Sequence, residues 1–201
     1  MHLKFNDLDK ASAYRLLTHT VTPRPIAWVL TENENGSYNV APFSYFTVIS
    51  SDPALLMISA GHKADGSKKD TWRNIERTEQ AVIHIADLSL IDALNETARP
   101  LPADVSELTN VDLPLCDEAG FELPRIQAAP VAFQTRLYDI HLVGNGPQGV
   151  IYTEVTHAYV NDELWLPDEN RVDETRLNPL SRLGGERYSG LGPVHSRARP
   201  N

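Results

Sequence analysis

Two long stretches of alternating apolar and polar residues limit what this chain can fold into. Residues 131–143 and 149–160 both alternate with a period of two, which is typical of a β-strand with one buried face. The run GNGPQG lies between them and predicts a turn. Because a short turn joins strands that run in opposite directions, the two stretches predict an antiparallel hairpin.

Shorter strand candidates precede this pair, with Asn35-Gly36 as a strong turn signal between the first two. These strands are expected at residues 26–31, 37–41, 43–49, 55–59 and 81–86. Helices are expected at residues 7–17, with Asp7 or Asp9 as the N-cap, and at 70–77 and 89–97. The strands outnumber the helices and do not alternate with them. This order favours an antiparallel barrel with small added helices over a parallel sheet.

The size and charge of the chain narrow its possible functions. Its 201 residues fit one domain, taken as residues 1–201, and its net charge is −9. An acidic chain is a poor binder of nucleic acid or of anionic lipid, so an anionic ligand must be held by local positive charge. The single cysteine, Cys116, excludes a disulfide within the chain. Without an apolar signal or membrane-spanning segment, the expected protein is soluble and cytoplasmic.

Several familiar catalytic and cofactor motifs are absent from the sequence. It contains no G-x-G-x-x-G, no P-loop, no H-E-x-x-H and no G-x-S-x-G. The seven histidines are scattered, so no metal site is expected, and His84 and His157 in strands are more often core residues than ligands. Ser44 has no visible base beside it for nucleophilic catalysis. The catalytic residues therefore stay unknown.

The segment SKKDTWRN, residues 67–74, has two possible interpretations. Its lysines and hydroxyls stand at the predicted start of a helix, where free N–H groups and the helix dipole favour a phosphate. Alternatively, Asp70 caps the helix and the lysines are solvated. The local residues do not decide between these interpretations.

The segment PLSRLGGERY, residues 179–188, is equally open. Its two adjacent glycines permit a close backbone approach or a left-handed turn. Arg182 could then hold an anion with its planar guanidinium. The alternative is a surface loop in which Arg182 pairs with an acidic side chain.

Four segments in this order resemble the flavin reductase-like proteins with an FMN-binding split β-barrel. The segments are TPRPIAWVLT (22–31), NVAPFSYF (39–46), KDTWRN (69–74) and PLSRLGGERY (179–188). Each segment is weak evidence alone, but the order and spacing are fairly specific to the family. The resemblance implies a mainly β fold, an antiparallel six-stranded split β-barrel of Greek-key type with a few peripheral helices. It also implies a homodimer with FMN near the subunit interface.

The resemblance also assigns roles to individual residues. Trp28, Val29 and the strand at 39–46 would line the isoalloxazine ring and the ribityl chain, with Ser44 bonded to the ring edge. Pro42 would end regular pairing where the backbone turns toward the ligand. The phosphate would be held by Lys69 and Thr71, with Asn74 nearby, and Arg182 and Tyr188 would close the site. The complete set of expected cofactor residues is Trp28, Val29, Asn39, Ala41, Pro42, Ser44, Tyr45, Phe46, Ser67, Lys69, Asp70, Thr71, Asn74, Arg182 and Tyr188.

The function implied by the resemblance is an FMN-dependent oxidoreductase. NAD(P)H would reduce the bound flavin, which would pass electrons to free flavin, a partner oxygenase or another small acceptor. Two alternatives stay open. One is an FMN carrier or sensor without efficient turnover, and the other is a split barrel that binds haem through His84, His141 or His157. Residues 99–130 contain no recognisable motif.

Overall fold

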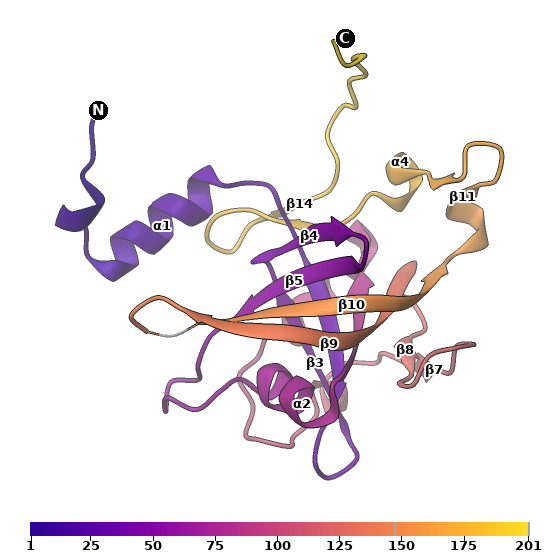
Figure 1. Ribbon diagram of the computed structural model, residues 1–201, viewed down its shortest axis with the longest axis horizontal. Coiled ribbons are helices and arrows are strands. Elements are labelled where there is room, and N and C mark those ends of the chain that lie inside the picture. The colour runs from indigo at the N-terminus through magenta and orange to yellow at the C-terminus, as the bar shows by residue number, and fades with distance from the viewer. Residues whose placement is uncertain (147, 201) are drawn as a thin grey trace.

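The computed structural model of the chain describes residues 1–146 and 148–200. A large, curved antiparallel sheet forms its centre (Figure 1). In spatial order its strands are β3 (Tyr38–Phe43), β2 (Ala27–Glu32), β6 (Gln80–Ile85), β9 (Val131–Val143), β10 (Gln148–Val160), β5 (Ala54–Ala60) and β4 (Phe46–Ser51). The predicted mainly β, antiparallel class is confirmed. Among the described residues this sheet has one strand more than the six that the resemblance implies.

The long hairpin predicted from the alternating pattern is present. β9 and β10 pair from Val131 with Val160 to Val143 with Gln148, with two irregularities in register. Each strand has 13 residues, so the hairpin is the longest element of the sheet. Pro147 of the predicted turn lies outside the described residues.

Strand β2 is buried on both faces and divides the hydrophobic core in two. Trp28 and Leu30 point into an outer core, whereas Ala27 and Val29 point into an inner core. All four side chains are fully buried. Because successive side chains of a strand alternate between faces, each face of β2 needs its own cover.

Helix α2 (Asp70–Thr78) covers the inner core. Its buried Trp72 and Ile75 pack against the sheet, which curls so that β3 and β5 also approach each other. Gly149 of β10 lies against the Trp72 ring, where a Cβ atom would stand 2.7 Å from the ring. Glycine is therefore required at this point of close contact.

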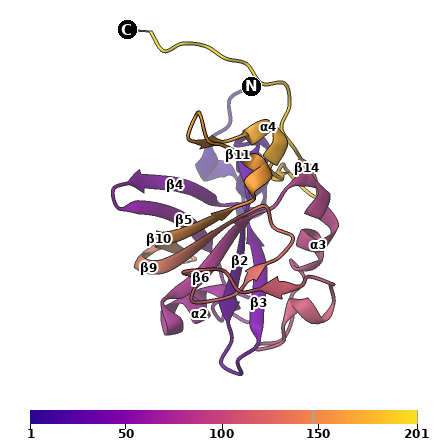
Figure 2. The same cartoon turned by 90° about the vertical axis from the view of Figure 1, so that its right-hand side faces the viewer.

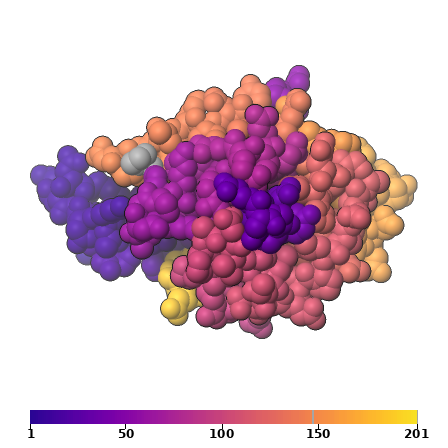
Figure 3. Space-filling view, turned by 90° about the horizontal axis from the view of Figure 1, so that it is seen from below, coloured from indigo at the N-terminus to yellow at the C-terminus, as the bar shows by residue number. Residues whose placement is uncertain are grey.

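Helix α3 (Ile91–Glu96) and the segment 97–130 cover the outer core. Leu113, Leu123 and Ile126 of that segment are buried against β2 and β6. In Figure 3 the segment forms a broad surface beside the β2–β3 hairpin. Residues 99–130 thus complete the core although they carry no recognisable motif.

Helix α1 (Lys10–Thr20) projects from the edge of the sheet (Figure 1), whereas α2 and α3 lie on opposite sides of β2 and β3 (Figure 2). Asp9, one of the two predicted caps, accepts a hydrogen bond from the backbone N–H of Ser12 at 2.7 Å. No helix among the described residues is long and apolar enough to cross a membrane.

The remaining elements are short. A small sheet contains β1 (Arg24–Pro25), β13 (Ser181–Arg182) and β14 (Tyr188–Ser189), and two further strand pairs are β7 (Leu115–Cys116) with β8 (Arg125–Ile126) and β11 (Trp165–Leu166) with β12 (Arg171–Val172). Helix α4 spans Glu174–Leu177, and 3-10 turns lie at Phe5–Asp7, Leu88–Leu90, Glu107–Thr109 and Asp162–Leu164.

His84 on β6 is a core histidine, as the sequence favoured. Its ring is fully buried, and Nε2 accepts the backbone N–H of Ile126 at 3.0 Å. Nδ1 must then carry the proton, which it donates to the carbonyl oxygen of Trp28 at 2.9 Å. Burial lowers the pKa of His84 to about 4, so the ring is neutral.

This neutral, buried ring predicts a pH-dependent stability. Between pH 7 and pH 5 an unfolded His84 takes up a proton that the folded protein does not. The fold should therefore lose about 2 kcal/mol of stability through this group as the pH falls. Denaturant unfolding at both pH values measures the loss. In a His84→Gln variant, whose side chain does not titrate, the loss of unfolding free energy between pH 7 and pH 5 should be smaller by that amount. An equal loss in both proteins would contradict a buried, neutral His84.

Candidate functional site

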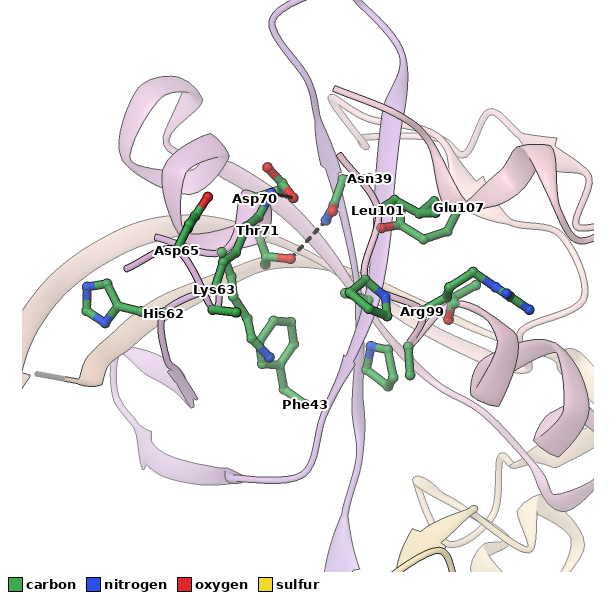
Figure 4. A pocket seen from close by; sticks show the side chains of 17 residues that line it. Asn39, Phe43, His62, Lys63, Asp65, Asp70, Thr71, Arg99, Leu101 and Glu107 are labelled. Carbon is green, nitrogen blue, oxygen red and sulfur yellow. Dashed lines mark hydrogen bonds and ion pairs between the residues drawn. The ribbon is translucent and has the colours of Figure 1, made fainter. Parts of the chain in front are cut away.

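Two adjoining cavities lie between the sheet and its covering segments. The first cavity has a volume of about 540 Å³ and the second about 790 Å³, both within the usual range of small-molecule sites. They meet at a shared boundary formed by Pro42, Phe43, His62, Lys69 and Ala98. Figure 4 shows the first cavity, which residues from β3, α2 and the segment after α3 surround. A long ligand could therefore extend from one cavity into the other.

The strand at 39–46 forms the wall between the two cavities, but its regular pairing ends later than expected. Pro42 still faces Trp28 in the β2–β3 register, which continues to Phe43. The chain leaves the sheet only at Ser44 and Tyr45, before β4 begins. Pro42 is tolerated because β3 is an edge strand of the sheet. Both residues of the break line the second cavity.

Of the two lysines in SKKDTWRN, the structure leaves Lys69 available to a ligand. Lys68 forms an ion pair with Glu76 at 2.6 Å. Lys69 has no carboxylate within ion-pair distance in residues 1–146 and 148–200, and it lines both cavities. Its Nζ lies 5.5 Å from the centre of the Phe43 ring, and burial lowers the pKa of Lys69. A cation without a carboxylate partner here fits an anionic group.

Asp70 and Thr71, which begin α2, also line the first cavity. Asp70 is neutralised by Lys63, at 2.6 Å, and by Arg73, at 3.1 Å. The Thr71 hydroxyl accepts a hydrogen bond from Asn39 Nδ2 at 2.8 Å (Figure 4) and can donate its own proton into the cavity. Two predicted residues, the Asn39 amide and the Thr71 hydroxyl, are thus brought together beside Lys69.

Asn74 and Ser67 do not lie in either cavity. Asn74 is fully buried, and its amide donates to Asn33 Oδ1 at 2.8 Å and to Thr31 Oγ1 at 3.1 Å. It therefore ties α2 to the β2–β3 hairpin. Ser67 instead donates its hydroxyl to Asp65 at 2.6 Å. These two residues were expected to help hold a phosphate. In the structure they instead shape the segments that surround the cavities.

Trp28, Val29 and Phe46 also line neither cavity. Trp28 and Val29 are fully buried, and Phe46 is buried in the inner core. The Trp28 indole N–H donates to the hydroxyl of Thr97 at 2.9 Å in the outer core. The structure therefore places these three side chains in the core rather than at a cavity, because both faces of β2 are covered and Phe46 of β4 packs in the inner core.

The segment 181–189, called here the closing segment, borders the second cavity. The Arg182 guanidinium lies 4.5 Å from the Tyr188 ring centre and donates to the Tyr188 hydroxyl and to the carbonyl oxygen of Gly185. Both predicted properties of the glycine pair are present. Gly185 has a φ of +66°, and Gly184 packs so closely on His19 that a Cβ would lie 2.3 Å from its ring.

Arg24 is the most important site residue that the sequence analysis did not assign. It lines the second cavity although the residue is only 8% exposed. Its guanidinium donates to the carbonyl oxygens of Thr18 and Val21, at 2.8 and 2.9 Å, and to that of Leu183 at 3.1 Å. Arg24 thereby joins the end of α1 to the closing segment. The feature of the sequence that could have indicated Arg24 is its position between two prolines in TPRP.

The segment after α3 supplies further residues that the sequence did not indicate. Arg99, Leu101 and Glu107 all line the first cavity (Figure 4). Glu107 accepts the backbone N–H of Val40 at 2.9 Å, and burial raises the pKa of its carboxyl group. No cluster of three or more His, Cys, Asp or Glu side chains suited to a metal ion is found in the described part of the chain.

The chain shares its sequence and fold with a known protein family. The family model described as "Flavin reductase like domain" matches residues 19–171, and the chain belongs to this family. The protein YwrF of Bacillus subtilis, which has no characterised function, is 35% identical over 98% of this chain and 97% of its own length.

Solved structures agree with this assignment. Nitrilotriacetate monooxygenase component B from Bacillus cereus has a TM-score of 0.92 and 30% identity, and the match covers 98% of each chain. The Pseudomonas fluorescens 2-nitrobenzoate 2-nitroreductase NbaA has a TM-score of 0.90 and 30% identity over 100% of this chain and 96% of its own. A Shewanella frigidimarina protein with a split barrel domain, at 16% identity and a TM-score of 0.86, shows the same fold. The chain is therefore a flavin-related oxidoreductase with the split-barrel fold.

The close contact between Gly184 and His19 yields a prediction about the closing segment. Gly184→Ala should lower the free energy of unfolding by about 1 kcal/mol, because the added methyl group must displace the His19 ring. Denaturant unfolding measures the change. Gly192→Ala is a matched control, because no atom lies within 4 Å of a Cβ at that position. In a His19→Ala background the cost of Gly184→Ala should vanish, and an unchanged cost there would refute the contact.

Proposed function

We propose that the chain is an FMN-binding, NAD(P)H-dependent reductase of the flavin reductase type. It would pass electrons to free flavin, to a partner oxygenase or to another small acceptor. The family supports the flavin, and the names of the two structures at 30% identity, a monooxygenase component and a nitroreductase, support a redox role. We also place FMN binding in a single domain over residues 1–201 of a cytoplasmic protein.

The observation that carries this proposal is the position of Lys69 at the junction of the two cavities. Lys69 reaches both cavities without a carboxylate partner among the described residues, beside the Thr71 hydroxyl at the start of α2. A phosphate dianion is best held by charge-assisted donors of this kind, and a helix N-terminus adds favourable dipoles. The residues present therefore fit the phosphate of FMN.

The rest of the flavin has a matching wall. Pro42, Phe43, Ser44 and Tyr45 give a surface of apolar and aromatic groups with the hydroxyls of Ser44 and Tyr45, at the boundary and in the second cavity. A flat aromatic ring needs such a surface with few polar contacts. We assign Ser44 and the backbone at the break to the polar edge of the ring, and Asn39 and Ala41 to the wall of the first cavity.

The proposed reaction requires no side chain of the protein to act as a general acid or base. The flavin, when bound, supplies the hydride and electron transfer, and the chain binds and orients it and shields it from water. Asp70 lies at the phosphate end but is neutralised by Lys63 and Arg73, so it would not repel the ligand. Arg182 and Tyr188 would cover the site from the closing segment.

We further propose that the protein is a homodimer. Large apolar side chains are exposed on three elements: Tyr14 and Leu17 on α1, Val48 and Ile49 on β4, and Leu142 on β9. Exposed apolar groups of this size on several elements favour association. The second cavity borders α1, so a partner subunit packed there would lie near the flavin.

A spectrum of the purified protein, followed by NADH and NADPH oxidation assays, tests the proposed function. Flavin absorption bands with turnover of either donor are the expected result. Bound flavin without turnover would favour the carrier, and a Soret band would favour the haem protein. His84, the buried candidate for a haem ligand, is not available for this role, because both of its ring nitrogens already have backbone partners. If the purified protein takes up no flavin, the proposal is refuted.

The adjacent lysines provide a sharp test of the phosphate site. Lys69→Gln should raise the Kd for FMN about tenfold or more, because it removes a charge-assisted contact. Lys68→Gln removes the same charge one residue away, but Lys68 is paired with Glu76. The Kd of this variant for FMN should therefore stay within about twofold of that of the unaltered protein. Quenching of flavin fluorescence measures both values. Riboflavin, which has no phosphate, should bind the two variants alike, and equal FMN affinities would refute the site.

A further inference from the structure

The second cavity has a one-sided charge that the composition of the chain does not explain. No aspartate or glutamate lines it among the residues that the structure describes, although the chain carries a net charge of −9. The first cavity, by contrast, includes Asp65, Asp70 and Glu107. The cationic side chains that line the second cavity are Arg15, Arg24, Lys69 and Arg182.

Two of these arginines face each other across a strand pair. Arg24 of β1 and Arg182 of β13 are Cα partners in the antiparallel register. Residues in this relation share one face of the sheet, and like charges placed directly opposite destabilise the pair. Neither arginine forms an ion pair with any carboxylate in residues 1–146 and 148–200. The strand pairing therefore places two arginines side by side, and neither has a carboxylate partner in the described part of the chain.

The hydrogen bonds of both arginines are made to neutral groups. Arg24 donates to three backbone carbonyl oxygens, and its Nε lies 3.4 Å from the Ser44 hydroxyl. Arg182 donates to the Gly185 carbonyl oxygen and to the Tyr188 hydroxyl. These contacts orient the guanidinium groups but leave both formal charges in place. Since Arg24 is only 8% exposed, water compensates its charge poorly.

The other walls of the second cavity are mixed, with polar groups from Thr18, His19, Ser59, His62 and Gln148. Beside the Phe43 and Tyr45 rings assigned to the flavin wall, Tyr14 and Tyr188 contribute rings, and Ile26 and Leu94 contribute aliphatic surface. A ligand that matches both the cationic and the aromatic parts of this surface has a flat ring and an anionic group. We propose that the second cavity binds a small aromatic carboxylate beside the flavin, with the carboxylate held by the cross-strand pair Arg24 and Arg182. The position beside the flavin rests on the proposed function, whereas the charge preference does not.

Calorimetric titration of the FMN-loaded protein with benzoate and with benzamide tests this site. The two probes match in shape and differ in charge, so benzoate should bind at least about tenfold more tightly. Arg182→Gln should reduce benzoate affinity about tenfold and leave benzamide unchanged, whereas Arg182→Lys should keep the preference. Arg136→Gln is the matched control, because Arg136 is paired with Glu154 and lines neither cavity. Equal binding of the two probes by the unaltered protein would overturn the proposal without any variant.

A crossed comparison separates this site from the phosphate site. Lys69→Gln should weaken FMN about tenfold and leave benzoate unchanged, whereas Arg182→Gln should weaken benzoate by a larger factor than it weakens FMN. If Arg182→Gln weakens FMN or NADH but not benzoate, the arginine pair serves those ligands and the proposal fails. If the protein takes up no flavin, the proposed function fails, and benzoate titration of the flavin-free protein still decides the charge preference.

Discussion

Burial of strand β2 on both faces is the constraint on which the rest of the structure depends. Its side chains from Ala27 to Leu30 are fully buried, and neighbours in the strand point to opposite sides. One side requires α2 and the curled sheet as cover, and the other requires α3 and the segment 97–130. The first cavity is lined by residues of both covers, so it forms where the two layers meet at the edge strand β3. The position of the site is thus a consequence of how the core is closed.

The edge position of β3 also explains why a proline and a break in pairing are tolerated at the wall of the site. An edge strand has hydrogen-bonding groups on one side that no neighbouring strand uses, so Pro42 costs little there. At Ser44 and Tyr45 the chain leaves β3 for β4, and both side chains face the second cavity. The buried amides of Asn39 and Asn74 fix the hairpin against α2 from the other side. The wall is therefore irregular in backbone but firmly supported.

Periodic parts of the sequence predicted the fold well, because their signal is local. The β9–β10 hairpin and α2 follow directly from alternation and from the polar start at Asp70. Whether Trp28 faces a ligand or the core could not be predicted, for a non-local reason. An apolar strand with one open face has the same pattern as a strand covered on both, and the second cover comes from residues 97–130, which carry no motif. Arg24 was missed for a related reason, since two of its acceptors, Thr18 and Leu183, are far apart in the chain.

The charges of the site illustrate why net charge constrains a ligand so weakly. At physiological ionic strength the field of a surface charge decays over about 8 Å, so most of the acidic groups of the chain have little influence inside the cavities. There the nearby groups decide, and Lys69, Arg24 and Arg182 have no carboxylate partner among the described residues. Burial already lowers the pKa of Lys69, which means that its charged form is less stable there than in water. A bound anion would reverse that penalty. An acidic protein can therefore select anionic ligands, provided that its cations are held where its own carboxylates do not pair with them.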